Sequence, residues 1–398
     1  MKSIYLDHNA TTPIDPRVIE AMERCFRETT ANAGSQHSAG RQAKRALEDA
    51  REEIISVLRG DPAHDRLILT SGGTEANNLA ILGMGPESRR GRILVSAIEH
   101  PSTLATADEL ERQGWQVDHI PASESGAIDL EKLRTLLEQS PRPRLVSVMA
   151  ANNETGVIQP LEKVVELSHA AGVPVHSDAV QVVGKMPFEF GRSGVDAISF
   201  TAHKFHGPAG IGGLLVREQT QVQPILFGGS QQLGKRPGTE PVALVVGMMT
   251  ALNLWNEEAD QRESGMRQSR DHLEDLLLQD STAVVNGQGE RLPHTLNLSF
   301  LGLDRQAMLM ALDMAGVACS TGSACASGSS EPSHVLEAMG LETGRIESSL
   351  RLSLGATSSL AEIDEAAKRI LKTVKHLRQS ETAPNSPSEP REKRRKSL

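Results

Sequence analysis

Two patterns of hydrophobic and polar positions follow one another in the first half of the chain, one typical of strands and one typical of helices. Short runs rich in Val, Ile and Leu, such as RLILT at 66–70 and RILVS at 92–96, are each followed by a longer stretch with helical spacing. The same order repeats at 115–120, 144–150 and 173–178. Alternating strands and helices form βαβ units, so the pattern predicts an α/β fold in which a mostly parallel sheet lies between helices.

The pattern changes after residue 216. A glycine-rich loop at 223–241 precedes a helical stretch at 242–278, with a possible break near Gly265. Shorter strand and helix patterns then lead to a last helix expected at 360–377. This second half predicts a smaller α+β unit rather than further βαβ repeats.

Two domains and a tail follow from this division. We expect a large domain over 15–250 and a small domain over 251–378, with segment 1–14 joined to the small domain. Residues 379–398 are polar, contain Pro and Ser, and lack apolar periodicity, so they predict a disordered tail. In an open α/β sheet, ligands bind beyond the carboxyl ends of the strands, which places the expected site in the large domain.

Composition and charge narrow the class of protein. The 398 residues carry 42 Lys and Arg against 51 Asp and Glu, and this net charge of -9 disfavours direct nucleic-acid binding. No apolar run approaches the ~20 residues of a membrane span, and the N-terminus lacks the apolar core of a signal peptide. Three cysteines without CxxC spacing predict neither a disulfide framework nor a metal site. We therefore expect a cytoplasmic protein without membrane contact.

Candidate chemistry gathers where expected strands end. Lys204, in SFTAHKFHGPAGIGG, follows a β run, and a partly desolvated lysine there can form a Schiff base. Asp178 ends the neighbouring run VPVHSD, where its carboxylate could pair with the pyridinium nitrogen of pyridoxal 5'-phosphate. Separately, a solvated lysine and an N-cap aspartate would explain these residues equally well.

Two further strand ends carry polar groups. In LILTSGGTEANNLAI a strand passes through Gly73 and Thr74 into a helix, whose free N–H groups would suit a phosphate. An ordinary capping box would also explain this segment. His100, in IEHPST, follows another strand and could stack on a flat ring, or simply pack or cap.

A thiol and a guanidinium complete the candidates. Cys325 lies in a run of small and polar residues that has no bulky apolar anchor, which predicts a mobile loop that presents a nucleophile. Cys319 and Cys25 are expected to be buried small residues. Arg351, inside the alternating strand SSLRLSLG, would suit a bidentate grip on a substrate carboxylate, although a surface edge strand would also explain it.

Together these segments resemble the cysteine desulfurases, which are fold type I enzymes dependent on pyridoxal phosphate. The matching motifs occur in family order from Ile4 to about Leu377 and include YLDHNATTP, SGGTEANN, EHPS, NNETG, HSDAVQ, HKFHGPAGIGG and GSACASGSSEPSHVL. The segment around Cys325 resembles the long catalytic loop of one branch of the family. The resemblance implies a large domain and a small one, as the alternation does.

The resemblance also implies a role for each matching residue. Lys204 would hold pyridoxal phosphate as a Schiff base, Asp178 would face its pyridine nitrogen, and His100 would stack over its ring. Gln181 would face the phenolic oxygen, and Asn153 would approach that oxygen or the substrate. The phosphate-binding residues would be Gly73, Thr74, Thr201, His203 and, in the family's homodimer, Thr239 of the partner subunit.

The implied reaction is the transfer of sulfur from L-cysteine. Arg351 would hold the substrate carboxylate with Asn32 near it, in the sequence Asn32-Ala33-Gly34-Ser35 where the family commonly has Asn-Pro-Ser-Ser. Released Lys204 would move the α-proton, and His100 could act as acid or base. Cys325 would take the sulfur as a persulfide, leaving L-alanine. An acceptor protein, such as an iron–sulfur scaffold or a thiolation enzyme, would then receive it.

Other functions remain open from the sequence alone. A selenocysteine lyase or another fold type I enzyme, such as an aminotransferase, would use the same cofactor set, although transamination needs no thiol at Cys325. An inactive scaffold of the same fold would bind an assembly partner without chemistry. Yellow colour that borohydride bleaches would separate the enzymes from the scaffold.

Overall fold

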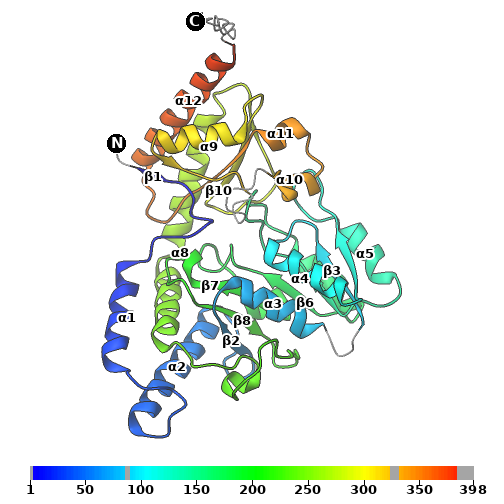
Figure 1. The fold of residues 1–398 in the computed structure, drawn as a ribbon, viewed down its shortest axis with the longest axis vertical. Coiled ribbons are helices and arrows are strands. Elements are labelled where there is room, and N and C mark those ends of the chain that lie inside the picture. The colour runs from blue at the N-terminus through cyan, green and yellow to red at the C-terminus, as the bar shows by residue number, and fades with distance from the viewer. Residues whose placement is uncertain (1–2, 86–89, 323–330, 383–398) are drawn as a thin grey trace, which may run out of the picture.

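The computed structural model describes residues 3–85, 90–322 and 331–382 of the chain (Figure 1). Its central element is a seven-stranded sheet in the order β2, β8, β7, β6, β5, β3, β4. The strands are β2 (Arg66–Thr70), β3 (Arg92–Ser96), β4 (Gln116–Ile120), β5 (Leu145–Ser147), β6 (Val175–Asp178), β7 (Ala197–Thr201) and β8 (Gly212–Val216).

Strand directions in this sheet match the predicted fold class. Strands β3, β4, β5, β6 and β7 pair in parallel, whereas β8 runs antiparallel to both β7 and β2. The exception has a simple cause, because the short connection from Thr201 to Gly212 has no room for the crossover that a parallel strand requires. The predicted mostly parallel α/β sheet is therefore confirmed.

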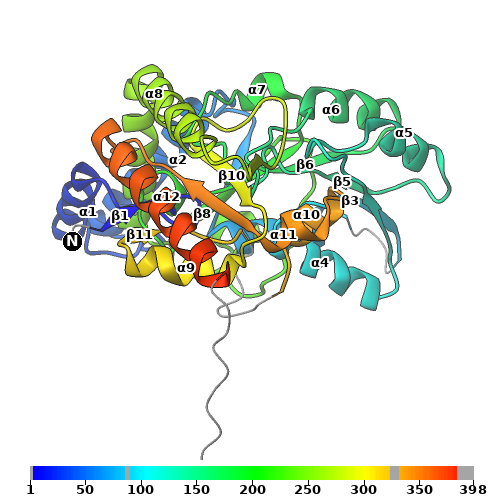
Figure 2. The ribbon, with the colours of Figure 1, turned by 90° about the horizontal axis from the view of Figure 1, so that it is seen from above.

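Helices cover both faces of the sheet. Helix α4 (Pro101–Arg112), which packs on α3 (Gly73–Met84), lies on the opposite side of the sheet from α5 (Leu130–Glu138) and α6 (Leu161–Ala170) (Figure 2). The remaining helices of this part are α1 (Pro16–Glu28), α2 (Ser38–Val57) and the short α7 (Phe190–Ser193). Every residue of β3, β5, β6, β7 and β8 is buried, as expected for strands covered on both sides.

One long helix, α8 (Val242–Leu277), connects the two main hydrophobic cores. Its first turns, with Val245 and Leu252, belong to the core of the large sheet, and Leu273 near its end belongs to the second core. The possible break near Gly265 is wrong, because α8 continues through this residue. Gly265 costs a helix only about 1 kcal/mol relative to alanine, and packing at both ends outweighs that cost.

The second core lies under a small sheet in the order β12, β10, β9, formed by β9 (Ala283–Val285), β10 (Thr295–Phe300) and β12 (Ser349–Ser353). A two-stranded pair joins β1 (Ile4–Tyr5) to β11 (Val317–Ala318). The core includes Ile4 and Leu6 from the N-terminal segment. We propose that it is the core of the expected small domain. The helices here are α9 (Arg305–Met314), α10 (His334–Ala338), α11 (Thr343–Glu347) and α12 (Leu360–Thr382).

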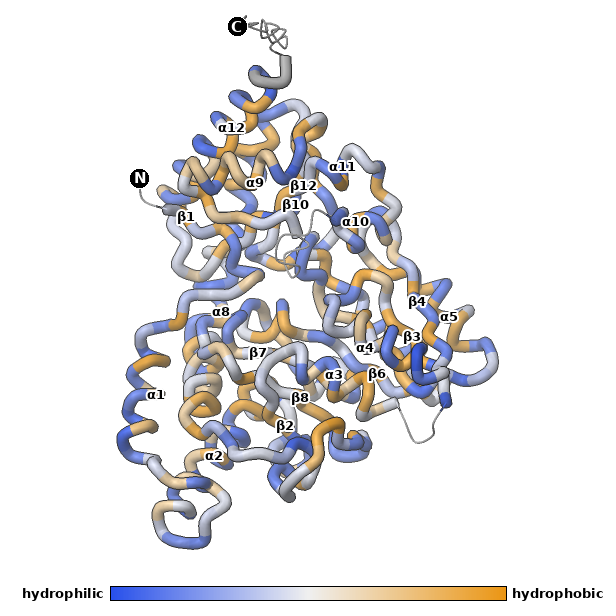
Figure 3. The backbone as a smooth tube through the Cα atoms, in the orientation of Figure 1, coloured by the Kyte–Doolittle hydropathy of each residue, from blue (hydrophilic) through white to orange (hydrophobic). Residues whose placement is uncertain are grey.

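The outer helices α1 and α12 each have one face toward the core and one face toward solvent. In Figure 3, α1 and α12 alternate between hydrophobic and hydrophilic residues, as expected for helices with one buried face. Helix α12 continues to Thr382, so it includes the first residues of the segment expected as a disordered tail, and the rest of that segment lies outside the described residues. None of the described helices is long and apolar enough to cross a membrane.

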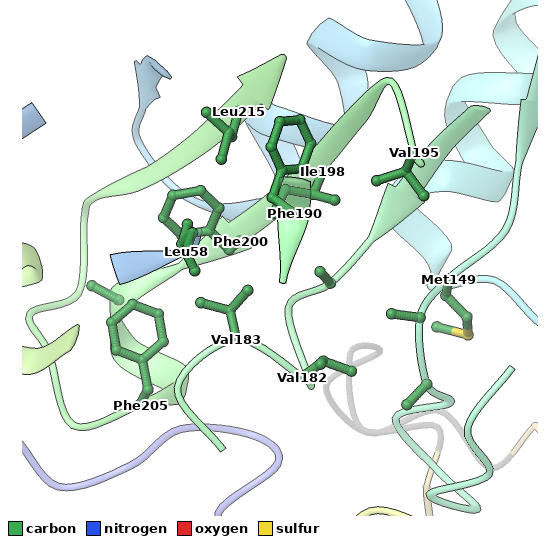
Figure 4. Packing of buried hydrophobic residues seen from close by; sticks show 14 of the residues in the cluster. Leu58, Met149, Val182, Val183, Phe190, Val195, Ile198, Phe200, Phe205 and Leu215 are labelled. Carbon is green, nitrogen blue, oxygen red and sulfur yellow. The ribbon is translucent and has the colours of Figure 1, made fainter. Parts of the chain in front are cut away.

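Buried aromatic side chains fix the segments that follow β6 and β7. Phe205 packs near Val183 and Val182, and Phe200 of β7 lies beside Leu215 of β8 (Figure 4). Phe205 directly follows Lys204, and Val182 directly follows Gln181. Two of the candidate site residues are therefore attached to backbone that the core holds in place.

Candidate active site

The candidate residues of the large sheet lie at the edge formed by the carboxyl ends of its parallel strands. Strand β6 ends at Asp178 and β7 ends at Thr201, and Asn153 and His100 follow β5 and β3. These four strands are parallel, so their carboxyl ends meet at the same edge of the sheet. Strand β2 also ends there, because it is antiparallel to β8, which is in turn antiparallel to β7.

Lys204 ends a short 3-10 helix that directly follows β7. Its half-buried amine donates hydrogen bonds to the carbonyl oxygens of Asn9, at 2.5 Å, and of Ala10, at 2.7 Å. The N-terminal segment therefore crosses the sheet edge and holds the amine at the site. The alternative of a fully solvated lysine is wrong.

A buried chain of hydrogen bonds joins Asp178 to His100. The Asn77 Nδ2 atom donates to Asp178 Oδ2 at 2.6 Å and to Ser102 Oγ at 2.9 Å. Ser102 Oγ lies 2.8 Å from His100 Nδ1, and the Ser102 backbone N–H also donates to Nδ1 at 3.1 Å. Because Nδ1 accepts, the ring proton of neutral His100 lies on Nε2. Burial lowers the pKa of His100, which favours this neutral form.

Sequence reasoning missed Asn77 and Ser102. Both lie in motifs that drew attention for other residues, SGGTEANN and EHPST. The available signal was Asn77 itself, a polar residue between Ala76 and Leu79 on the buried side of α3. The Asp178 carboxylate has a second fixed contact, because its Oδ1 accepts the Val180 N–H at 2.9 Å.

The start of α3 has the features of a phosphate cradle. Its N-cap, Gly72, has no side chain to accept from the first-turn N–H groups. A Cβ on Gly73 would lie 3.0 Å from Val180 Cγ2 and 3.5 Å from Thr201 Cγ2, so glycine lets the backbone approach β7 closely. Free N–H groups and the helix dipole favour an anion at this position. The alternative of a complete capping box is wrong, because Gly72 supplies no acceptor.

The other phosphate candidates differ in placement. Thr201 Oγ1 donates to Ile211 O at 3.0 Å, and a Cβ on Gly72 would lie 3.7 Å from it, so this hydroxyl borders the cradle. Thr74 is exposed in the first turn of α3. Burial and nearby Lys204 lower the pKa of His203 to about 4, so its imidazole is neutral at physiological pH. Thr239 is exposed in the loop before α8.

Gln181, Asn153 and Lys204 all contact Asn9 of the N-terminal segment. Gln181 Nε2 donates to Asn9 O at 3.1 Å, the same carbonyl that accepts from Lys204. Asn9 Nδ2 in turn donates to Asn153 O at 3.1 Å. Within the described ranges, Asn153 Oδ1 is buried without a hydrogen-bond partner, which leaves an acceptor available for a bound molecule.

Arg351 is directed inward from β12 and is only 2% exposed, so the surface interpretation is wrong. Its Nη1 donates to Asn153 O at 3.1 Å, and its Nη2 donates to Asp7 Oδ1 at 2.8 Å. Its Nε is buried and has no hydrogen-bond partner among the residues that the structure describes. Asp7 was not among the predicted residues, and nothing in the local sequence pairs it with a residue 344 positions away.

One predicted residue, Asn32, is not joined to this group within the part of the chain that the structure describes. Asn32 is exposed in the connection between α1 and α2, where its Oδ1 accepts from the Gly34 N–H at 2.8 Å. That connection lies far from β12 in Figure 3. Cys325 lies outside the described residues. Within the described part of the chain, no three His, Cys, Asp or Glu side chains could hold a metal ion.

Comparison with known proteins identifies the family of the chain. Residues 4–365 match the class-V aminotransferase family. An IscS-like cysteine desulfurase of Mycobacterium tuberculosis is 41% identical over 388 residues, covering 95% of this chain and 98% of the relative. A putative cysteine desulfurase of Bacillus subtilis, IscS 1, is 39% identical over 382 residues, covering 95% of this chain and 100% of the relative.

Solved structures show the same similarity. A NifS-like protein superposes with a TM-score of 0.87 at 34% identity and covers 94% of this chain and 100% of its own. A NifS-like protein from Rickettsia africae gives a TM-score of 0.86 at 31% identity, with 94% and 99% covered. The chain therefore belongs to the class-V aminotransferase family and, within it, to the cysteine desulfurases.

Proposed function

We propose that the protein removes sulfur from L-cysteine, releasing L-alanine and holding the sulfur as a persulfide on Cys325. The observation that carries this proposal is the grouping of Lys204, the Asp178 chain to His100, and Arg351 around one edge of the sheet. Full-length similarity to cysteine desulfurases supports the same reaction. The final acceptor would be a protein such as an iron–sulfur scaffold or a thiolation enzyme, and the working form would be a homodimer.

The residues present fit pyridoxal phosphate. The uncapped start of α3, bordered by Thr201, suits its phosphate, and Asp178 suits its pyridine nitrogen. Lys204 would join its aldehyde, and Gln181 would face its phenolic oxygen. The buried Asn153 Oδ1 has no hydrogen-bond partner among the described residues, so it can accept a hydrogen bond from a bound molecule. When bound, this cofactor withdraws electrons from the Cα of an amino acid, which makes the α-proton acidic.

The side chains supply the remaining chemistry. Lys204 can take the α-proton, because two carbonyl oxygens fix its amine at the edge of the sheet. His100, neutral with its proton on Nε2, can act as acid or base near the substrate sulfur. Asn77 and Ser102 connect His100 to Asp178 by hydrogen bonds. The same two side chains therefore fix the positions of both residues.

The direct test uses purified protein loaded with pyridoxal phosphate and supplied with L-cysteine. We expect one L-alanine for each sulfur removed, and a persulfide at Cys325 visible by mass spectrometry. Folded, cofactor-loaded protein that forms neither product would contradict the proposal. Faster turnover of L-selenocysteine without persulfide formation would indicate a selenocysteine lyase, and protein that never turns yellow would indicate a scaffold.

Replacing Arg351 with lysine should weaken substrate binding. Lysine would keep the ion pair with Asp7 but cannot grip a carboxylate with two parallel hydrogen bonds. We expect the KM for L-cysteine to rise about 10- to 100-fold, since a hydrogen bond to a charged group contributes about 1.5–3 kcal/mol. The change in kcat should be smaller.

Steady-state kinetics check this expectation. Arg378→Lys is the matched control, because Arg378 also pairs with an aspartate, Asp280 at 2.7 Å, but lies on α12. The control should leave KM unchanged. A fall in kcat at constant KM for Arg351→Lys would exclude the assigned substrate-binding role.

A further inference from the structure

A lysine with no assigned role is buried directly behind the candidate site. Lys185 lies in the turn after β6 and is 4% exposed. Its Nζ donates to Gln181 Oε1 at 2.6 Å and lies 3.2 Å from His294 Nε2. Neither partner is a carboxylate. Burying an amine without an acidic partner is costly, so this placement needs a physical explanation.

The surroundings of Lys185 are basic. Burial, with contributions from Lys204 and Arg351, lowers the pKa of Lys185 well below its usual range. A neutral amine still donates hydrogen bonds, so the contact with Gln181 does not depend on its charge. The titratable and charged groups that interact with Lys185 are His8, His203, Lys204, His206, His294 and Arg351.

The Gln181 amide has two different ends, and each faces a different lysine. Nε2 donates to Asn9 O, the carbonyl that also accepts from Lys204 Nζ. Oε1 accepts from Lys185 on the other side. A flipped amide would have nearly the same shape, but it would set Nε2 against the Lys185 amine and Oε1 against the Asn9 carbonyl. The Asn9 carbonyl and the Lys185 amine together therefore hold the orientation in which the N–H groups face Lys204.

We propose that Lys185 is a positioning residue, which holds the Gln181 amide so that an N–H group faces the phenolic oxygen of the bound cofactor. This inference rests on the proposed function, in which Gln181 faces that oxygen. An N–H donor stabilises the oxygen as an anion. It therefore lowers the affinity for the proton shared between this oxygen and the Lys204 nitrogen, and that proton controls the visible absorption of the bound cofactor.

The test is a pH titration of cofactor absorption in the Lys185→Met holoenzyme. Methionine is one atom shorter than lysine and has a flexible, unbranched side chain, so it fills most of the same space without a donor. The Gln181 Oε1 then loses the donor that holds it, so the amide turns more freely and its N–H group is held less firmly toward the phenolic oxygen. We expect the midpoint of the titration to rise by about one pH unit or more relative to the unmodified holoenzyme. Lys163→Met, at an exposed position of α6, is the control and should leave the midpoint unchanged.

A double substitution separates positioning from a direct effect of the amine. Gln181→Leu alone should raise the midpoint, and adding Lys185→Met to it should give no further shift, because Lys185 acts through Gln181. Additive shifts would overturn the proposal in favour of a direct electrostatic effect, and an unchanged midpoint in Lys185→Met would also overturn it.

Two further results keep the test decisive. Lys185→Gln has a side chain one atom shorter, which ends short of Gln181, so it should reproduce the shift if Lys185→Met does not fold. Lys185→Arg keeps a donor for Gln181 Oε1, so this variant should keep the original midpoint. An unmodified protein that binds no cofactor would refute the proposed function itself, whereas shifts absent from a yellow holoenzyme would refute only the role of Lys185.

Discussion

Replacing Lys204 with alanine is expected to lower the turnover of L-cysteine by about 1,000-fold or more. A positioned acid or base contributes roughly 10²–10⁴-fold to a rate, and Lys204 also supplies the expected covalent link to the cofactor. The carbonyl oxygens of Asn9 and Ala10 that fix its amine would remain, but they cannot accept and return a proton. L-Alanine formation measures the loss.

The readouts of this variant separate chemistry from folding. Borohydride should attach the cofactor to the unmodified protein but not to Lys204→Ala, and mass spectrometry reports the difference. Lys163→Ala is the control, since Lys163 pairs with Glu166 at 2.6 Å on the exposed side of α6 and should leave turnover unchanged. Turnover of Lys204→Ala within tenfold of the unmodified enzyme would refute the assignment of Lys204.

The fold was largely predictable because hydrophobic periodicity is a local property. The runs at 66–70 and 92–96 became β2 and β3, and the helical patterns between the runs became the covering helices. The unbroken course of α8 was not predictable at Gly265, because it depends on two cores at opposite ends of the helix. Local propensity is weaker than such tertiary packing.

The candidate site was predictable only in part, for a related reason. Lys204, Asp178 and His100 follow strands, and parallel strand ends meet at one edge whatever the rest of the chain does. The partners that orient them come from distant segments. Asn77 reaches Asp178 across 101 residues, and Asp7 reaches Arg351 across 344. No periodicity reports contacts of this kind.

The three thiols of the chain differ in their surroundings. Burial and nearby Asp7 raise the pKa of Cys319 to about 12, and burial raises the pKa of Cys25, so both thiols stay protonated at neutral pH. A protonated thiol is a poor nucleophile. Cys325 lies outside the described residues, but the residues on either side of its segment lie against one carboxylate. Ser333 Oγ donates to Glu154 Oε2 at 2.5 Å, and a Cβ on Gly322 would lie 2.5 Å from the same atom.

Glu154 directly follows Asn153, so Gly322 and Ser333, which precede and follow Cys325 in the sequence, lie beside the candidate site. Cys325→Ser is therefore expected to reduce L-alanine formation by about 1,000-fold or more, because a serine hydroxyl remains protonated at neutral pH and an external thiol lacks the effective concentration of a held one. Visible absorption of the cofactor should persist, since Lys204 and Asp178 are intact. Cys319→Ser should form the persulfide on Cys325 at the normal rate, because the Cys319 thiol of the unmodified protein is already held protonated. Persulfide on Cys319, or full activity in Cys325→Ser, would transfer the nucleophilic role away from Cys325.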